Sequence, residues 1–148
     1  MDNTSSSNPE RHESRTAQTF VFFVRDLVST GAFGSVEEAV RAAGVVLTLL
    51  EQRLTGEEAR DLNAQLPIKL QEIISEARKP LQGRSVAKIH RDEFVSAVAG
   101  ALGVDEQRAE TMIRNVFLTV RAHISEGEAK DVASQLPLDL KPMWSEPA

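Results

Sequence analysis

The sequence has no cysteine in its 148 residues. A disulfide framework and a thiolate metal site are therefore both excluded. Long apolar runs are also missing, because the longest, residues 20–24, is far too short to cross a bilayer. Residues 1–16 contain no apolar segment of the signal-peptide type. We therefore expect a cytoplasmic protein without a membrane partner.

Catalytic signatures are missing as well. There is no G-x-S-x-G element, phosphate loop or dinucleotide fingerprint. The three histidines, His12, His90 and His123, have no spacing that a metal favours, and His123 fits a cation near the end of a helix. The sequence accordingly predicts no enzyme, no catalytic residue, no cofactor and no metal site.

The formal net charge is −5, which argues against nucleic acid as the main partner because phosphate contacts need clustered cations. Residues 17–78 and residues 89–144 each carry a net −3, whereas residues 79–88 carry +3. The three cations of this short segment are Lys79, Arg84 and Lys88. A solvated connector is our interpretation of this segment, and salt-sensitive DNA binding is the alternative.

What the chain does contain is an internal duplication. Residues 54–74 and residues 124–144 align without a gap, and seven of the 21 positions are identical. Average composition gives roughly one or two identities by chance. Two copies of one motif in a chain of this length indicate a repeated structural unit.

Periodicity and caps make this unit helical. Apolar residues recur every three or four positions after a capping box at Ser35, and their counterparts follow Asp105. Residues 19–28 resemble a strand by composition, but the matching residues 93–102 have a helical pattern, with Phe94 opposite Phe23.

Further capping boxes at Thr55 and Ser125 open a third helix in each copy. Each third helix ends at a Gln-Leu-Pro corner, because proline disfavours helical geometry at the preceding residue. We expect short fourth helices at 68–78 and 138–144. The fold class is therefore all-α, a tandem-duplicated helical bundle of two pseudo-symmetric units with three to four helices each.

The expected domain organisation follows from these boundaries. A disordered tail at 1–16 precedes repeat 1 at 17–78, a linker at 79–88 leads to repeat 2 at 89–144, and a frayed tail occupies 145–148. Neither repeat buries its apolar face well alone, so we expect the two to share one core.

The most specific parts of the pattern are residues 54–62, with the sequence Leu-Thr-Gly-Glu-Glu-Ala-Arg-Asp-Leu, and the Gln-Leu-Pro corner. This pattern resembles the prokaryotic family catalogued as domain of unknown function 2267, over about residues 20–144. The second copy departs from it, with Lys130 in place of Arg60. If the family has a site that requires arginine at this position, this copy has lost it. The resemblance implies a small bacterial helical protein with two similar halves, and it implies no activity.

Four acidic residues are the candidates for chemistry: Glu58, Asp61, Glu128 and Asp131. One hypothesis is a symmetric metal or acid–base site, but carboxylate-bridged sites in helical bundles normally include a Glu-x-x-His motif, which is absent here. We favour the other interpretation, in which these acids cap free amides and face the positive ends of the helix dipoles.

The two corners are candidate interaction sites: Gln65, Leu66, Pro67, Gln135, Leu136 and Pro137. The structural interpretation has proline set the corner, leucine enter the core, and glutamine bond a free backbone group at the break. The functional alternative is that the two corners frame a groove for a partner helix or peptide.

The first helix is more apolar around its circumference than one core-facing stripe requires, so we predict a self-association surface at Phe20, Phe22 and Phe23. The leading functional hypothesis is a non-enzymatic interaction module, with a protein partner or a second copy as its ligand. The alternative is a small-molecule or metal-dependent activity between the two repeats.

Overall fold

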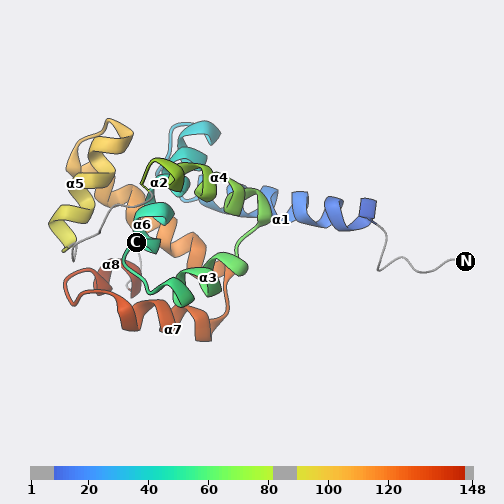
Figure 1. Ribbon diagram of the computed structural model, residues 1–148. Helices are drawn as coiled ribbons and strands as arrows, with labels where there is room; N and C mark the ends of the chain where they lie inside the picture. The colour runs from blue at the N-terminus through green and yellow to red at the C-terminus, as the bar shows by residue number, and fades with distance from the viewer. Residues whose placement is uncertain (1–8, 82–89, 146–148) are drawn as a thin grey trace, which may run out of the picture.

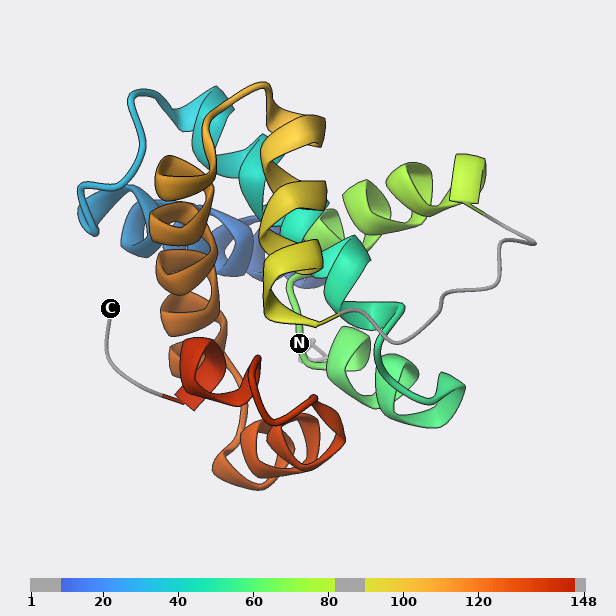
Figure 2. The same ribbon diagram turned by 90° about the vertical axis from the view of Figure 1, so that its left-hand side faces the viewer.

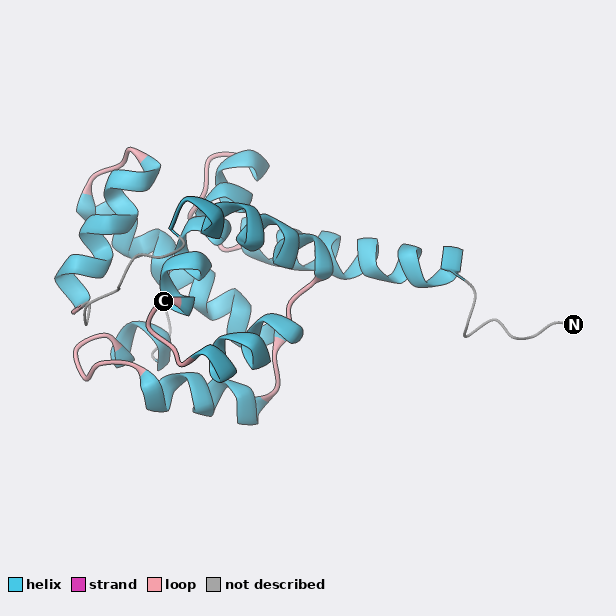
Figure 3. Ribbon diagram, in the orientation of Figure 1, coloured by secondary structure: helices cyan, strands magenta, loops and turns pink. Residues whose placement is uncertain are grey.

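The computed structural model describes residues 9–81 and 90–145. Within these residues the chain forms helices and connecting turns and no strand (Figure 3), which confirms the all-α prediction. The helices, labelled in Figure 1, are α1 (Pro9–Ser29), α2 (Val36–Glu51), α3 (Gly56–Ala64), α4 (Ile68–Arg78), α5 (Arg91–Leu102), α6 (Glu106–His123), α7 (Glu126–Gln135) and α8 (Lys141–Ser145).

The predicted N-caps set the helix starts. The side-chain oxygens of Ser35 and Asp105 accept backbone amides three residues on, at 3.0 and 2.7 Å. Thr55 and Ser125 do the same at the starts of α3 and α7, at 3.2 and 3.1 Å. Each cap satisfies one of the amides that a helix start leaves without a partner. The predicted fourth helix of the first copy is confirmed as α4, with the same bounds, whereas α8 begins only at Lys141, three residues after its predicted start.

The first helix begins earlier than composition suggests. Residues 9–16, predicted as part of a disordered tail, form the first turns of α1, and residues 1–8 lie outside the described part of the chain. The Ser- and Asn-rich composition of this tail comes mainly from residues before Pro9, and proline suits the first turn of a helix. The N-terminal end of α1 projects away from the rest of the molecule (Figure 1; Figure 3).

A single hydrophobic cluster holds residues of both 17–78 and 89–144. Helices α2 and α6 lie at its centre: α2 contacts α1, α4, α5 and α6, and α6 also contacts α1, α5 and α8. The ring of Phe117 meets that of Trp144 edge-on at 5.2 Å between centroids, and the ring centroid of Phe94 lies 6.1 Å from that of Phe117. These three aromatic side chains are at most 1% exposed, so they anchor α5, α6 and α8 together.

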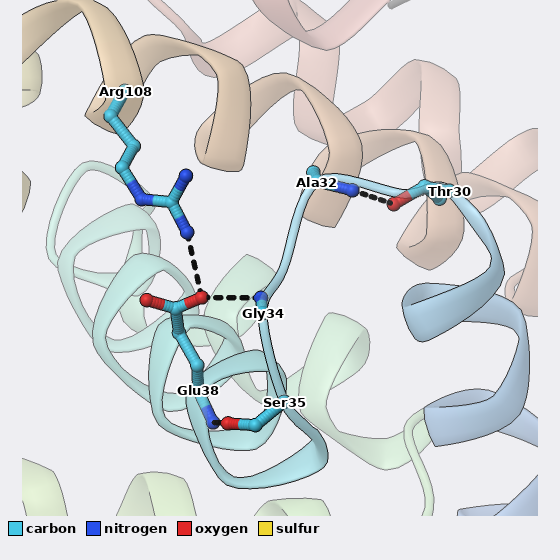
Figure 4. Close-up of polar contacts among 6 residues, drawn as sticks. All are labelled: Thr30, Ala32, Gly34, Ser35, Glu38 and Arg108. Carbon is cyan, nitrogen blue, oxygen red and sulfur yellow. Dashed lines mark hydrogen bonds and ion pairs between the residues drawn. The ribbon is translucent and has the colours of Figure 1, made fainter.

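Polar contacts hold the start of α2 to α6. Arg108 donates to Glu38 Oε1 at 2.8 Å, and the same oxygen accepts the amide of Gly34 at 2.7 Å (Figure 4). Of the two hydrogen bonds of the predicted capping box at Ser35, only the one from the Glu38 amide to the Ser35 hydroxyl forms. The Glu38 carboxylate accepts the amide of Gly34, the residue before the N-cap, instead of the amide of Ser35. The Gly34 amide, followed by Arg108, lowers the pKa of Glu38. None of the described helices has the length and apolarity needed to span a membrane.

Candidate functional site

Helices α3 and α7 lie side by side at the lower end of the molecule in both ribbon views (Figure 1; Figure 2). The amide of Thr55, at the start of α3, donates to Gln135 Oε1 at 2.8 Å. The amide of Ser125, at the start of α7, donates to Gln65 Oε1 at the same distance. Each glutamine nitrogen also lies 3.4 Å from the hydroxyl of the opposite N-cap. We call this reciprocal pair of contacts the glutamine clasp; it holds the two helices antiparallel.

The glutamine clasp corrects two predictions. The sequence assigns each corner glutamine to a free backbone group at its own break, but the bonded amide belongs to the other half of the chain. A capping box also requires Glu58 and Glu128 to accept the N-cap amides. Those amides are taken by the glutamines, so the two glutamates do not complete the boxes.

Instead, Glu58 and Glu128 lie buried between α3 and α7. Each is 6% exposed, and each has one carboxylate oxygen, Oε2, that is buried without a hydrogen-bond partner. Ligand oxygens of Glu58, Glu128 and Asp131 all lie within 4.8 Å of one another. We call these three residues the carboxylate cluster. In the described part of the chain it is the one group of three potential metal ligands at such short distances.

The cluster has an unusual proton affinity. Burial, followed by the neighbouring acids Glu128, Asp131 and Asp61, raises the pKa of Glu58 to about 8. Two carboxylates at close range do not both ionise readily, because each charge disfavours the other. At neutral pH Glu58 therefore retains a proton, and its protonated carboxyl is a hydrogen-bond donor to Glu128.

The two predicted interaction corners line separate hollows rather than one groove. The 65–67 corner, together with Thr19, Ile68 and His123, lines a cavity of about 240 Å³. The 135–137 corner lines a cavity of about 680 Å³ with Arg53, His90, Leu138 and Asp139. Leu66 and Leu136 are buried, as the structural interpretation expects. The residues that follow the prolines, Ile68 and Leu138, are exposed.

A third cavity, the α1–α2 groove, is almost entirely apolar. Its volume is about 610 Å³, and its lining residues are Phe20, Val21, Val24, Arg25, Val28, Ser29, Val36 and Val40. Val21 and Val36 remain 58% and 53% exposed. Phe22 lies beside the groove, 44% exposed, with the Arg25 guanidinium 5.0 Å from its ring centroid.

The predicted surface on the first helix is therefore corrected at one residue. Phe23 is 1% exposed and meets the ring of His123 edge-on at 5.2 Å, so it belongs to the core. Phe20 is half-buried and lines the groove, while Phe22 is exposed. Phe23 and Leu27 follow the helical spacing of one buried face, but the apolar neighbours Val21 and Phe22 hide this face from an interpretation based on composition.

His90 and His123 have structural partners. His123 Nε2 lies 2.8 Å from Asp26 Oδ2 and so links α6 to α1. His90 Nδ1 lies 3.3 Å from Asp139 Oδ2. His12 falls in the first turns of α1, and its side chain lies outside the described part of the structure. These contacts give His90 and His123 a role in joining parts of the fold, and neither indicates a metal ligand.

The predicted basic connector is described only in part. Lys79 pairs with Glu76 at 2.9 Å, and it belongs to a short 3₁₀ turn, η2 (Lys79–Leu81). Arg84 and Lys88 lie outside the described residues. The alternative of nucleic-acid binding at this segment therefore stays a prediction.

One ion pair between a buried acid and a partly exposed arginine has no counterpart in the sequence predictions. Glu51 is 7% exposed and accepts from Arg78 at 2.7 Å. Burial raises the pKa of Glu51, and Arg78 partly offsets that effect. The two residues also line a cavity of about 270 Å³ between α2, α3 and α4. In the sequence, the only sign of this pair is an acid, Glu51, at the end of the apolar stripe of α2. Its partner Arg78 lies 27 residues further along the chain, so no local pattern joins the two.

Comparison with protein families gives one match. The family model described as "Uncharacterized conserved protein (DUF2267)" matches residues 7–143, nearly the whole chain. No curated protein matches the sequence. The description of the family names no activity, so function has to be argued from the surfaces and clusters above.

Proposed function

We propose that this chain, which belongs to the DUF2267 family of uncharacterized conserved proteins, is a non-enzymatic helical module that associates with a second copy of itself. The α1–α2 groove is the contact surface, and α1 of the second copy is its occupant. The observation that carries the proposal is the exposure of Val21, Phe22 and Val36 beside one apolar cavity.

The apolar character of this surface is the first support. A contiguous apolar area that remains in contact with water marks an interaction site more often than an isolated exposed side chain does. In the α1–α2 groove, Val21 and Val36 line the cavity from two different helices, and the exposed ring of Phe22 contacts Arg25, which also lines it. Covering these side chains removes apolar area from water at about 25 cal/mol per Å².

The course of α1 is the second support. Its first turns extend beyond the body, where no other described helix runs alongside them (Figure 1). A lone helical segment in water is marginally stable, because most helical stability in proteins comes from packing. An antiparallel α1 from a second copy covers both the groove and this extension. Such a twofold contact uses the same surface on both copies and closes at the dimer.

A tandem duplication, which we also propose, supplies the third support. The reciprocal glutamine clasp and the matching N-caps favour two equivalent units, with α5 as the counterpart of α1. At the offset of 71 that pairs Phe23 with Phe94, the counterparts of the exposed stretch 20–22 are Arg91, Asp92 and Glu93. Since the same positions are charged in α5, the fold does not require them to be apolar in α1.

The test is the oligomer mass of variants, by size-exclusion chromatography with light scattering. Val21 is exposed in the chain, so Val21→Asp leaves helicity unchanged and, if the groove is the interface, converts a dimer to a monomer. Phe22→Asp acts in the same direction. Leu138→Asp is the matched control, because Leu138 is 83% exposed and lines a different cavity.

Two results argue against the proposal. One is a dimer mass that is unchanged in Val21→Asp and Phe22→Asp. The other is equal dissociation of the Leu138→Asp control, because loss of any exposed apolar side chain then has the same effect. Circular dichroism on every variant separates dissociation from unfolding.

The alternative function is a small-molecule or metal-dependent activity between the two halves. The carboxylate cluster favours it, because three acids meet there at the junction of α3 and α7. However, an activity also needs room for a substrate, and none of the four cavities described above is lined by Glu58, Asp61, Glu128 or Asp131. The arrangement therefore favours binding of an ion over catalysis.

A further inference from the structure

We infer that the carboxylate cluster is a binding site for one hard divalent cation of the size of Ca²⁺. The site is independent of the α1–α2 groove, because it lies between α3 and α7. Its ligands are Glu58 on α3 and Glu128 and Asp131 on α7, so a bound ion bridges the two helices.

The first argument is the state of the buried oxygens. Glu58 and Glu128 are each 6% exposed, and the Oε2 atom of each has no hydrogen-bond partner. Buried polar atoms are rarely left in this state, because an unsatisfied group costs about 1–3 kcal/mol or more. Both unpartnered atoms belong to the side chains of one cluster. A cation at this place supplies a partner for both atoms when it displaces the proton that Glu58 otherwise retains at neutral pH.

The ordinary role of these acids is already filled. A glutamate three residues after an N-cap usually accepts the N-cap amide, but the glutamine clasp occupies the amides of Thr55 and Ser125 at 2.8 Å. The side chains of Glu58 and Glu128 are consequently directed to each other and to Asp131. Asp131 is exposed, so it gives the cluster a side that faces solvent, where an ion enters.

The chemistry of the donors selects the class of ion. All three ligands are carboxylates, and oxygen donors without histidine or cysteine suit hard cations such as Ca²⁺, Mg²⁺ and Mn²⁺. The charges that act on Glu58 come from Glu128, Asp131 and Asp61, and all of them are acidic. A divalent cation neutralises most of this charge.

The distances between the ligand oxygens of the cluster favour an ion of a particular radius. Two ligands on opposite sides of one ion are separated by at most twice the metal–oxygen distance. That limit is about 4.2 Å for Mg²⁺ and about 4.6–5.2 Å for Ca²⁺. The ligand oxygens all lie within 4.8 Å of one another, so every pair fits within the span of Ca²⁺, whereas any pair near that limit is too wide for Mg²⁺.

The experiment is calorimetric titration of the full chain with Ca²⁺, and separately with Mg²⁺, after treatment with EDTA. We expect saturation at one Ca²⁺ per chain, weaker binding of Mg²⁺, and a Tm several degrees higher in Ca²⁺. Trp144 gives an independent signal, because its indole nitrogen donates to the carbonyl of Ala129 on α7 at 3.0 Å. Its fluorescence should change with the same midpoint.

Variants assign the site. Glu58→Gln and Asp131→Asn should each lower the Ca²⁺ affinity about tenfold or more, because each removes one of three charged ligands. Glu57→Gln is the matched control: it removes one charge from an exposed neighbour on the same helix. Asp131 is also exposed, so Asp131→Asn tests the site even if Glu58→Gln disturbs folding.

The inference is overturned if the wild-type chain shows no saturable heat and no Tm shift with Ca²⁺. Glu58 and Glu128 then share a proton and no ion. It is also overturned if Glu57→Gln weakens binding as much as Glu58→Gln does, because the ion then responds only to surface charge. The oligomer mass in EDTA is measured alongside, so failure of this site is distinguished from failure of the proposed self-association.

Discussion

Replacing Glu58 with glutamine should remove most of the pH dependence that the carboxylate cluster gives to folding. The pKa of Glu58 is about 8 in the folded chain, against an ordinary value of 4.5. Between these two values the folded chain holds a proton that the unfolded chain has released. The free energy of unfolding of the metal-free protein therefore falls as pH rises from about 4.5 to about 8.

The size of this effect follows from the same shift. One pKa unit corresponds to about 1.4 kcal/mol, so the rise from 4.5 to about 8 costs at most about 5 kcal/mol. That is a large part of the roughly 5–15 kcal/mol by which domains are stable. Glutamine has nearly the shape of the protonated acid and does not ionise. Glu58→Gln should therefore match the wild type near pH 4 and exceed it in stability by up to this amount above pH 8.

The assay is urea denaturation in EDTA, followed by circular dichroism at several pH values between 4 and 9. The difference in unfolding free energy between wild type and variant is the informative quantity, because other titrating groups cancel in it. Glu57→Gln, whose side chain is exposed, should show no such difference. If wild type and Glu58→Gln run parallel across the whole range, the buried pair does not hold a proton and the reasoning is wrong.

Three further predictions concern stability, each measured by urea denaturation. Gly44→Ala should destabilise the fold by about 1–3 kcal/mol, because a Cβ there meets a side chain of α4 at 2.9 Å. Gly100→Ala should stabilise it by about 0.5–1 kcal/mol, because a Cβ at that position meets no other atom. A loss of stability in both variants would contradict the clash at Gly44. Gln135→Ala should cost about 1 kcal/mol by opening one side of the glutamine clasp, and no loss would mean that water replaces it. Arg78→Met should cost about 2–3 kcal/mol and should also make stability fall more steeply with pH, because Glu51 is left buried without its cation.

Much of the fold follows from local signals in the sequence. The N-caps at Ser35, Thr55, Asp105 and Ser125 mark helix starts because a short polar side chain satisfies amides within the same turn. These contacts span three residues, so a sequence pattern contains all of their parts. The all-α class needs nothing beyond such patterns.

The candidate site is harder to predict because its contacts are distant in the chain. The bonds of the glutamine clasp join residues 60 and 80 positions apart. The sequence does not show that a distant glutamine takes the N-cap amide, so a glutamate three residues after the N-cap is interpreted as part of a capping box. The residues around Glu58 in the sequence also do not show whether its side chain is solvated or buried. Phe23 illustrates the same limit, since its neighbours Phe22 and Val24 are apolar too and the buried face is set only by packing.

Sedimentation equilibrium of the wild-type chain over a series of concentrations tests the proposed self-association most directly. If the α1–α2 groove accepts α1 of a second copy, the mass should rise from the monomer value of 16.3 kDa towards twice that value, as one monomer–dimer equilibrium. A mass that stays at 16.3 kDa up to about 1 mM would contradict the account, because a dissociation constant weaker than this corresponds to less than about 4 kcal/mol of binding.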